Sequence, residues 1–238
     1  MLLLGHRGAV HPTAPENTLA AVERALRQGA DGVEVDVRVT ADGVPVCHHD
    51  PSLERTADDR RLVALTPYAD LPWIGSHRVP RLSEMVDLLA GRGRLVVELK
   101  APGWPLLEAP ESLSAVADVL RRHRLDHVSV SSFDRLRLRA FRGLGPACPT
   151  ALLGRPAVPL LGLLRQATQD GHPEVHPHVS SVLTQPQALT SATLRVTSWT
   201  VNRPEDLRLL RELGVQAVIT DDPAAARQVL APPLADVG

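Results

Sequence analysis

The sequence predicts an α/β fold, a closed (β/α)₈ barrel of the TIM type that forms a single domain over residues 1–238. Two observations predict it. Short apolar segments typical of strands alternate with segments of helical periodicity along most of the chain, and parallel strands joined by crossover helices produce this alternation. The length of 238 residues is close to the roughly 250 residues of such a barrel. An open, doubly wound sheet is the alternative.

Eight short segments, most of them rich in valine or leucine, have the length of buried strands. They cover residues 2–5, 32–39, 94–100, 127–133, 148–154, 174–179, 195–201 and 215–221. The first predicted helix places Leu19, Val22 and Leu26 on one face and ends at Gly29, a residue type that often ends helices. The predicted helices cover residues 16–29, 83–90, 111–122, 134–144, 159–171, 186–194, 204–214 and 222–230.

Residues 50–81 differ from the rest of the chain, because they are rich in proline, aspartate and arginine and show no hydrophobic period. We interpret them as an extended loop inserted after the second strand, and not as a separate domain. The insertion is short.

Composition excludes several functional classes. The chain has 26 basic and 27 acidic residues, so no basic excess indicates nucleic-acid binding and no charged block indicates a membrane surface. No apolar run reaches the roughly 18 residues of a transmembrane helix, and the start MLLLGHRGAV does not resemble a signal peptide. The two cysteines, Cys47 and Cys148, are expected to be reduced thiols. We therefore expect a soluble, cytoplasmic protein that acts on a small molecule; the oligomeric state is not predicted.

Charged residues alternate with valines in the second strand, residues 32–39. The valines share one face, and Glu34, Asp36 and Arg38 share the other. An antiparallel strand with one solvated face gives the same pattern, but a parallel barrel covers both faces, so the charged residues would face the interior. Two buried carboxylates repel each other unless one is protonated or a cation binds. Oxygen ligands favour Mg²⁺ or Ca²⁺, and Glu98 in the third strand is a candidate third ligand.

Lys100 is the one lysine in the chain and lies at the C-terminal end of the third predicted strand. Active sites of (β/α)₈ enzymes lie at that end of the barrel, and a lysine ammonium binds phosphate as a compact charge. An ion pair with Glu98 or a surface lysine is the simpler explanation. We favour a role in binding the substrate.

Further polar residues follow the first two strands. His6 and Arg7 lie just past the C-terminal end of the first strand in the motif GHRG, and His48 and His49 follow the second in VPVCHHD. Two imidazoles beside carboxylates and a metal would supply an acid and a base near neutral pH. Trp199, at the end of the seventh strand, is a candidate for the core or for a wall of the substrate site.

Taken together, these motifs resemble the glycerophosphodiester phosphodiesterase family. The resemblance runs over almost the full length and rests on GHRG, PENT, EVDVRVTADGVPVCHHD, VVELK, SSFD, SWTVN and ITDDP in this order. Each motif alone is weakly specific, whereas their joint order and spacing are specific.

The resemblance implies a (β/α)₈ barrel that hydrolyses glycerophosphodiesters to sn-glycerol 3-phosphate and an alcohol. It implies one divalent metal ion, Mg²⁺ or Ca²⁺, bound by Glu34, Asp36 and Glu98. It also selects His49 over His48 as the partner of His6 in acid and base catalysis. In the implied reaction the glycerol hydroxyl attacks first, and water then opens a cyclic phosphate.

In this site Arg7 and Lys100 are expected to bind the phosphate and Trp199 the departing alcohol. The alternatives are a lysophospholipase D that uses the same residues and, less favoured, a non-catalytic barrel that binds a phosphorylated ligand.

Overall fold

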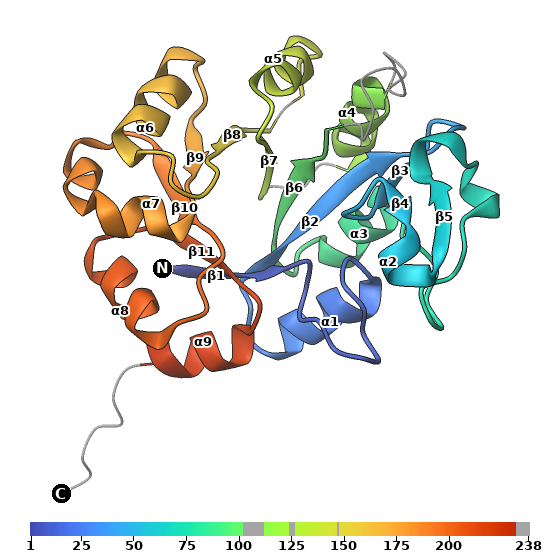
Figure 1. The fold of residues 1–238 in the computed structure, drawn as a ribbon, viewed down its shortest axis with the longest axis horizontal. Coiled ribbons are helices and arrows are strands. Elements are labelled where there is room, and N and C mark those ends of the chain that lie inside the picture. Colours follow the sequence, from blue (N-terminus) through green and yellow to red (C-terminus); the bar gives the residue numbers. More distant parts are fainter. Residues whose placement is uncertain (102–111, 124–126, 147, 232–238) are drawn as a thin grey trace, which may run out of the picture.

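In the computed structural model, which describes residues 1–101, 112–123, 127–146 and 148–231, parallel strands form a closed barrel inside a ring of helices (Figure 1). The strand order around the barrel is β1-β11-β10-β9-β8-β7-β6-β2. Strand β1 (Leu2–His6) pairs in parallel with β2 (Gly32–Val39) on one side and with β11 (Ala217–Thr220) on the other. This closure confirms the predicted barrel and excludes the open sheet.

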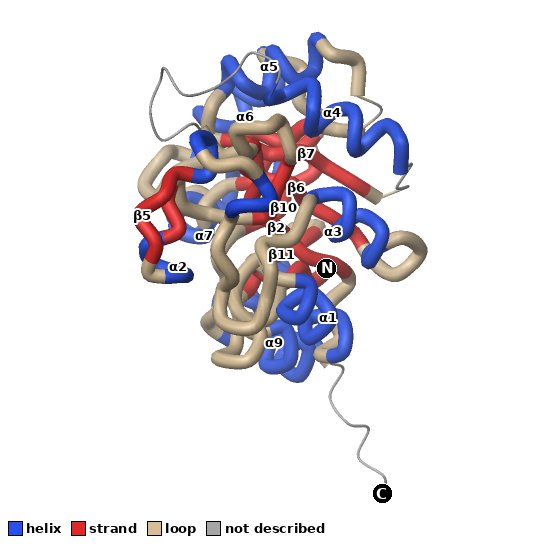
Figure 2. Tube along the Cα trace, turned by 90° about the vertical axis from the view of Figure 1, so that its right-hand side faces the viewer, coloured by secondary structure: helices blue, strands red, loops and turns tan. Residues whose placement is uncertain are grey.

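The remaining barrel strands coincide with the predicted segments but are mostly shorter. They are β6 (Arg94–Leu99), β7 (Val128–Ser132), β8 (Thr150–Leu153), β9 (Glu174–His176) and β10 (Arg195–Ser198). The tube in Figure 2 shows these strands in the middle of the molecule with helices outside them.

Helices cover the outer face of the barrel. They are α1 (Leu19–Arg27), α3 (Leu82–Leu89), α4 (Ser112–His123), α5 (Arg135–Gly143), α6 (Leu160–Gln169), α7 (Val179–Thr184), α8 (Pro204–Glu212) and α9 (Pro223–Leu230). Side chains of Thr18, Asp134 and Asp222 cap α1, α5 and α9 by accepting hydrogen bonds from backbone N–H groups of the first turn. Beyond residue 101, the connection between the third predicted strand and its helix lies outside the described residues, and so does residue 111 at the predicted start of that helix. Among the described helices, none has the length and apolar character needed to cross a membrane.

The chain between β9 and β10 differs from the prediction. The strand expected over 174–179 ends at His176, and the helix expected over 186–194 is a 3₁₀ helix over Pro186–Ser191, preceded by the short helix α7. His178 begins α7, because its side chain accepts a hydrogen bond from the backbone N–H of Ser180. Pro186 has no backbone N–H, which prevents a continuous α-helix through this position.

The insertion is more ordered than an extended loop, so that part of the prediction is wrong. Strand β3 (Pro45–Cys47) folds back antiparallel to β2. A second, two-stranded sheet follows, made of β4 (Ser52–Leu53) and β5 (Asp59–Leu62) around the one-turn helix α2 (Glu54–Ala57). Two 3₁₀ turns, Val63–Leu65 and Tyr68–Asp70, lead back to α3.

The insertion and the preceding strand β3 enclose an apolar cluster of their own. The buried members are Val46, Leu53, Val63, Ile74 and Val79. Their irregular spacing along the chain gives no helical or strand period, which explains why the sequence pattern did not reveal the cluster.

Strand β2 has the two faces that its alternation predicts. Val33, Val35 and Val37 are at most 2% exposed and belong to the main core between strands and helices. Glu34 and Asp36 are buried on the opposite, inner face. The barrel therefore directs two carboxylates inward near the C-terminal end of the strand.

Candidate active site

Three carboxylates from two adjacent strands meet at the C-terminal end of the barrel. Asp36 on β2 lies opposite Glu98 on β6 in the parallel register, and Glu34 lies opposite His6 on β1. One carboxylate oxygen from each of Glu34, Asp36 and Glu98 lies within 4.8 Å of the others, and the three residues are only 4%, 1% and 9% exposed. This is the grouping that the strand alternation predicted.

The three carboxylates influence one another's protonation. Burial raises the pKa of the Glu34 carboxyl to about 8, and the charge of Asp36 adds to this shift. Burial and the charge of Asp36 also raise the pKa of Glu98. Asp36 shows the opposite result: burial acts to raise its pKa, but the charges of Lys100 and Arg7 lower it.

The donor set fits a divalent cation. All three side chains offer carboxylate oxygens, the ligands that hard cations prefer. Within the described part of the chain, Glu34 Oε1 is buried and has no hydrogen-bond partner, and such an atom is costly to bury unless a proton or cation binds it.

Two basic side chains contact this acidic group. Lys100 Nζ lies 2.6 Å from Glu98 Oε1 and 2.9 Å from Asp36 Oδ1. Arg7 Nε lies 3.1 Å from Asp36 Oδ2, and its Nη1 lies 3.2 Å from Glu16 Oε1. The ion pair between Lys100 and Glu98 that the sequence left open is therefore present, and Lys100 also belongs to the site.

A tight turn after β1 positions Arg7. Arg7 and Gly8 have φ angles of 56° and 92°, in the left-handed region that favours glycine. At Gly8 a Cβ atom would lie 2.5 Å from the backbone of Ala21, so the turn packs directly against α1. The turn also lets Arg7 N–H donate to the backbone oxygen of Glu34 at 2.9 Å.

His6 is held by a carboxylate from the other end of the chain. Its Nδ1 lies 2.7 Å from Asp221 Oδ1 after β11, and Asn202 Nδ2 donates to Asp221 Oδ2 at 2.6 Å. Although burial acts to lower the pKa of His6, the hydrogen bond with Asp221 and the charge of Glu34 raise it.

His49 follows β3 and contacts its sequence neighbour. Its Nδ1 lies 2.6 Å from Asp50 Oδ1. Burial lowers the pKa of His49, even though the charge of Asp36 acts to raise it. The adjacent His48 is only 1% exposed, and its two ring nitrogens contact the backbone oxygen of Asp50 and Thr56 Oγ1, each at 2.9 Å. His48 is thus enclosed by the insertion, whereas His49 lines a cavity.

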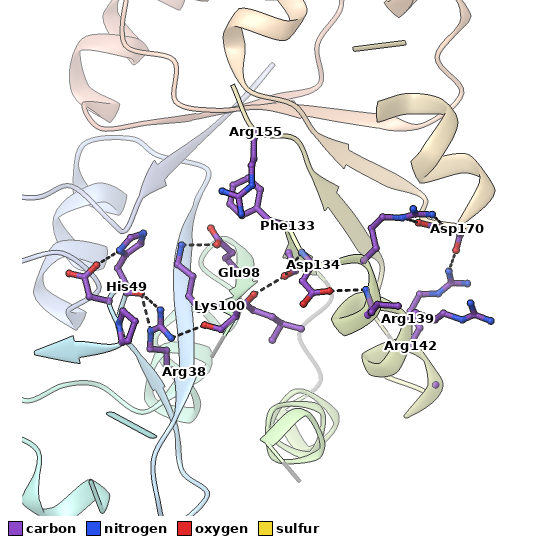
Figure 3. A pocket seen from close by; sticks show the side chains of 18 of the residues that line it. Arg38, His49, Glu98, Lys100, Phe133, Asp134, Arg139, Arg142, Arg155 and Asp170 are labelled. Atoms are coloured by element: carbon purple, nitrogen blue, oxygen red, sulfur yellow. Dashed lines mark hydrogen bonds and ion pairs between the residues drawn. The ribbon is translucent and has the colours of Figure 1, made fainter. Parts of the chain in front are cut away.

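That cavity has a volume of about 1310 Å³ and runs from Glu98, the one of the three carboxylates that lines it, along the C-terminal ends of β6, β7 and β8 (Figure 3). His49, Glu98 and Lys100 line one end of it. Arg38 lines the same end, where its guanidinium donates to the backbone oxygens of His49 and Ala101.

Trp199 lies beside this cavity and not in its lining. Its ring makes edge contacts with Phe133 and His178 at centroid distances of 5.5 Å and 5.2 Å. Its Nε1 donates to the backbone oxygen of His176 at 3.0 Å. The residue packs against the small apolar cluster inside the barrel, and it supports Phe133, which does line the cavity.

Sequence reasoning missed the carboxylates that hold the two histidines and Arg7. Glu16, Asp50 and Asp221 stand inside motifs that were noticed. Glu16 and Asp221 lie 9 and 215 positions from their partners Arg7 and His6, so no local pattern indicates these contacts. Asp50 directly follows His49, and this adjacency was the one available signal. Arg55 was missed as well. It reaches from α2 to Glu16, with Nη2 2.6 Å from Oε1, and to Asp50, with Nε 2.6 Å from Oδ2.

Comparison with known proteins places this site in context. A model of the glycerophosphoryl diester phosphodiesterase family matches residues 6–225. A glycerophosphodiester phosphodiesterase of Caldanaerobacter subterraneus is 28% identical over 235 residues, which cover 93% of this chain and 94% of the relative.

Solved structures of phosphodiesterases have a similar fold. A phosphodiesterase of Oleispira antarctica in complex with the product sn-glycerol-3-phosphate has a TM-score of 0.82 and 27% identity, covering 96% of each chain. A glycerophosphodiester phosphodiesterase of Thermotoga maritima, 23% identical, has the same fold with a TM-score of 0.80 over 96% of this chain and 98% of that one.

Proposed function

The chain belongs to the glycerophosphoryl diester phosphodiesterase family, and from this premise we propose that Glu34, Asp36, Glu98, His6 and His49 form its catalytic site. The protein is a phosphoric diester hydrolase that converts glycerophosphodiesters to glycerol 3-phosphate and an alcohol. The observation that carries the site assignment is the convergence of three buried carboxylates beside two histidines at the C-terminal end of the barrel.

Glu34, Asp36 and Glu98 would hold one divalent cation, Mg²⁺ or Ca²⁺. Such a cation, when bound, polarises a phosphate oxygen and offsets the negative charge of the diester. The unpaired Glu34 Oε1 and the raised pKa of this carboxyl support the assignment.

The two histidines would transfer protons. One accepts the proton of the attacking hydroxyl, and the other donates a proton to the alcohol oxygen as its bond to phosphorus breaks. Both imidazoles contact an aspartate through Nδ1, His6 with Asp221 and His49 with Asp50. The aspartate orients each ring, and the other ring nitrogen, Nε2, would accept or donate the proton.

Arg7 and Lys100 would bind the phosphate. Both contact Asp36, so they stand next to the position of the cation. A guanidinium and an ammonium there would stabilise the negative charge that builds up on the phosphate oxygens. Trp199 would act indirectly, as the support of Phe133.

We include the whole chain in one domain, with the insertion as part of the active site. Arg55 of the insertion contacts Glu16 and Asp50, and through them it supports Arg7 and His49.

The function is tested with purified protein, a panel of glycerophosphodiesters and lysophosphatidylcholine, assayed with and without Mg²⁺ or Ca²⁺. We expect release of glycerol 3-phosphate that requires a divalent cation. Faster release of choline from lysophosphatidylcholine than from glycerophosphocholine would instead assign lysophospholipase D activity. Full activity in the presence of a strong chelator would contradict the cation site.

A further inference from the structure

All glycerophosphodiesters share a glycerol phosphate part. The cavity beside the proposed catalytic residues is larger than this shared part requires. Pockets that enclose a drug-sized ligand have volumes of roughly 300–1,000 Å³, and glycerol phosphate is smaller than such a ligand. The cavity of about 1310 Å³ continues past Lys100 and Phe133 to helix α5. The departing alcohol is the part of the substrate that varies, so its binding site would lie in this extension.

Arginines dominate the extension, which we call the arginine groove. Figure 3 shows His49 and Lys100 at one end of the cavity and Arg139 and Arg142 at the other, with Phe133 and Arg155 between them. The arginine groove is lined by Phe133 and by four arginines and two aspartates, namely Arg135, Arg139, Arg142, Arg155, Asp134 and Asp170.

The two aspartates have other partners. Asp134 caps α5 through the backbone N–H groups of Leu136 and Arg137. Asp170 binds Arg135, with Nε 2.6 Å from Oδ2, and its backbone oxygen accepts a hydrogen bond from Arg142. Across the described residues, Arg139 and Arg155 lie within ion-pairing distance of no carboxylate, and both are exposed. Two guanidiniums are thus free to bind a ligand.

The position of Arg155 also limits which alcohols fit. Its Cζ lies 4.8 Å from the centre of the Phe133 ring. A quaternary ammonium group such as choline binds over an aromatic face, but here a guanidinium already covers that face. A choline group in the arginine groove would meet like charge, and an acyl chain would remove arginines from water without a partner.

We propose that the arginine groove binds the departing alcohol and selects alcohols that carry an anionic group of their own, above all a phosphate. This inference rests on the proposed function. Guanidinium groups bind phosphate oxygens in pairs of hydrogen bonds, and Arg139 and Arg155 offer two such groups on the path away from Lys100. The preferred substrates are therefore glycerophosphodiesters whose alcohol is a phosphorylated polyol.

The test compares two substrates that differ mainly in this charge. One is glycerophosphoglycerol, whose departing alcohol is neutral glycerol. The other is bis(glycerophospho)glycerol, whose departing alcohol carries a further phosphodiester. We expect kcat/KM for glycerol 3-phosphate release to be roughly tenfold higher for the second, which corresponds to about one additional charge-assisted contact. The preference should shrink as salt is added, because these charges are exposed to solvent.

Variants identify the residues responsible. The double variant Arg139→Ala/Arg155→Ala should lose most of the preference, since kcat/KM for the anionic substrate should fall about tenfold more than for glycerophosphoglycerol. Arg208→Ala, an exposed arginine on α8 outside the cavity lining, is the matched control and should retain the preference. Arg155→Ala alone should raise the rate on glycerophosphocholine relative to glycerophosphoglycerol, because the Phe133 face becomes free.

Equal kcat/KM values for the two substrates, or a preference that survives in the double variant, would overturn the inference. Hydrolysis of glycerophosphoglycerol separates this failure from a failure of the proposed function: if neither substrate is hydrolysed, the proposed function itself is wrong.

Discussion

At the scale of single residues, the proposed site consists of pairs in which a second polar or charged side chain holds each functional group. Asp221 and Asp50 orient His6 and His49. Asn17 orients Asp36, because its Nδ2 donates to Asp36 Oδ2 at 2.8 Å and its Oδ1 accepts from the Asp36 backbone N–H at 3.0 Å. Residues held in this way need little reorganisation during the reaction, which is how fixed charges lower a barrier.

Replacing either histidine should remove proton transfer but leave cation binding intact. We expect His6→Ala and His49→Ala each to lower kcat by about 10²–10⁴-fold, measured as release of glycerol 3-phosphate, with Mg²⁺ or Ca²⁺ binding unchanged by calorimetry. His127→Ala, an exposed histidine preceding β7 at the opposite end of the barrel, is the control. If His49→Ala kept full activity while a folded His48→Ala lost it, the assignment within the pair would be wrong by one position.

Glu34→Gln should stabilise the metal-free protein at alkaline pH and weaken its stabilisation by a cation. Burial and Asp36 raise the pKa of this carboxyl from 4.5 to about 8, so the metal-free fold loses stability as the pH rises from about 4.5 to about 8, and the loss is complete above that range. The amide carries no charge, and we expect the metal-free variant to melt at a higher temperature than metal-free wild type at pH 9. Differential scanning fluorimetry in chelator measures this. An equal or lower melting temperature at pH 9 would argue against repulsion among the three acids.

At the scale of elements, the insertion does more than connect β2 to α3. Its helix α2 carries Arg55, whose Nη1 and Nη2 contact Glu16 at 2.9 Å and 2.6 Å and whose Nε contacts Asp50. These two carboxylates in turn contact Arg7 and His49. One guanidinium from the insertion therefore supports the proposed phosphate-binding group Arg7 and the proposed catalytic residue His49 together.

Arg55→Ala should impair catalysis without unfolding the barrel. Loss of a group that orients functional residues typically costs about 10–100-fold in activity, and we expect a drop in kcat of that size with little change in melting temperature. Added guanidinium should restore part of the activity, which a loss of folded structure would not allow. Arg60→Ala, whose partner Glu54 lies at the surface of the same insertion, should remain fully active; a similar loss there would point to a general effect of the insertion.

At the scale of the whole molecule, closure of the barrel brings distant parts of the chain together. His6 and Asp221 are 215 positions apart and contact each other because β1 pairs with β11. Glu34 and Glu98 meet because β2 pairs with β6. A cation held by these strands would bind only the folded chain, so its binding free energy should add to the stability of the whole barrel.

We therefore expect a divalent cation to raise the melting temperature. At a concentration 100 times its dissociation constant, a ligand of the folded state adds about 2.7 kcal/mol, which corresponds to a rise of roughly 5–10 °C for a protein of this size. Thermal scans with chelator, with Mg²⁺ and with Ca²⁺ measure it, and Glu34→Gln should show a much smaller rise. An identical melting temperature in chelator and in excess cation would contradict a cation site in the barrel.

The sequence by itself determined the fold class, the strands and the three acidic residues, because these depend on local patterns. Alternation within β2 fixes which side chains face inward, and alternation of strands and helices predicts parallel pairing. The same rules failed where order arises without a period, in the insertion and in the segment from His178 to Ser191.

Only the tertiary structure decided which groups surround those acids. The contact of Asp221 with His6 and that of Arg55 with Glu16 join residues 215 and 39 positions apart. The arginine groove likewise combines residues of α5 with Arg155, which follows β8. The physical reason is that contacts between side chains depend on where strands end in space, and strand pairing and barrel closure set those positions.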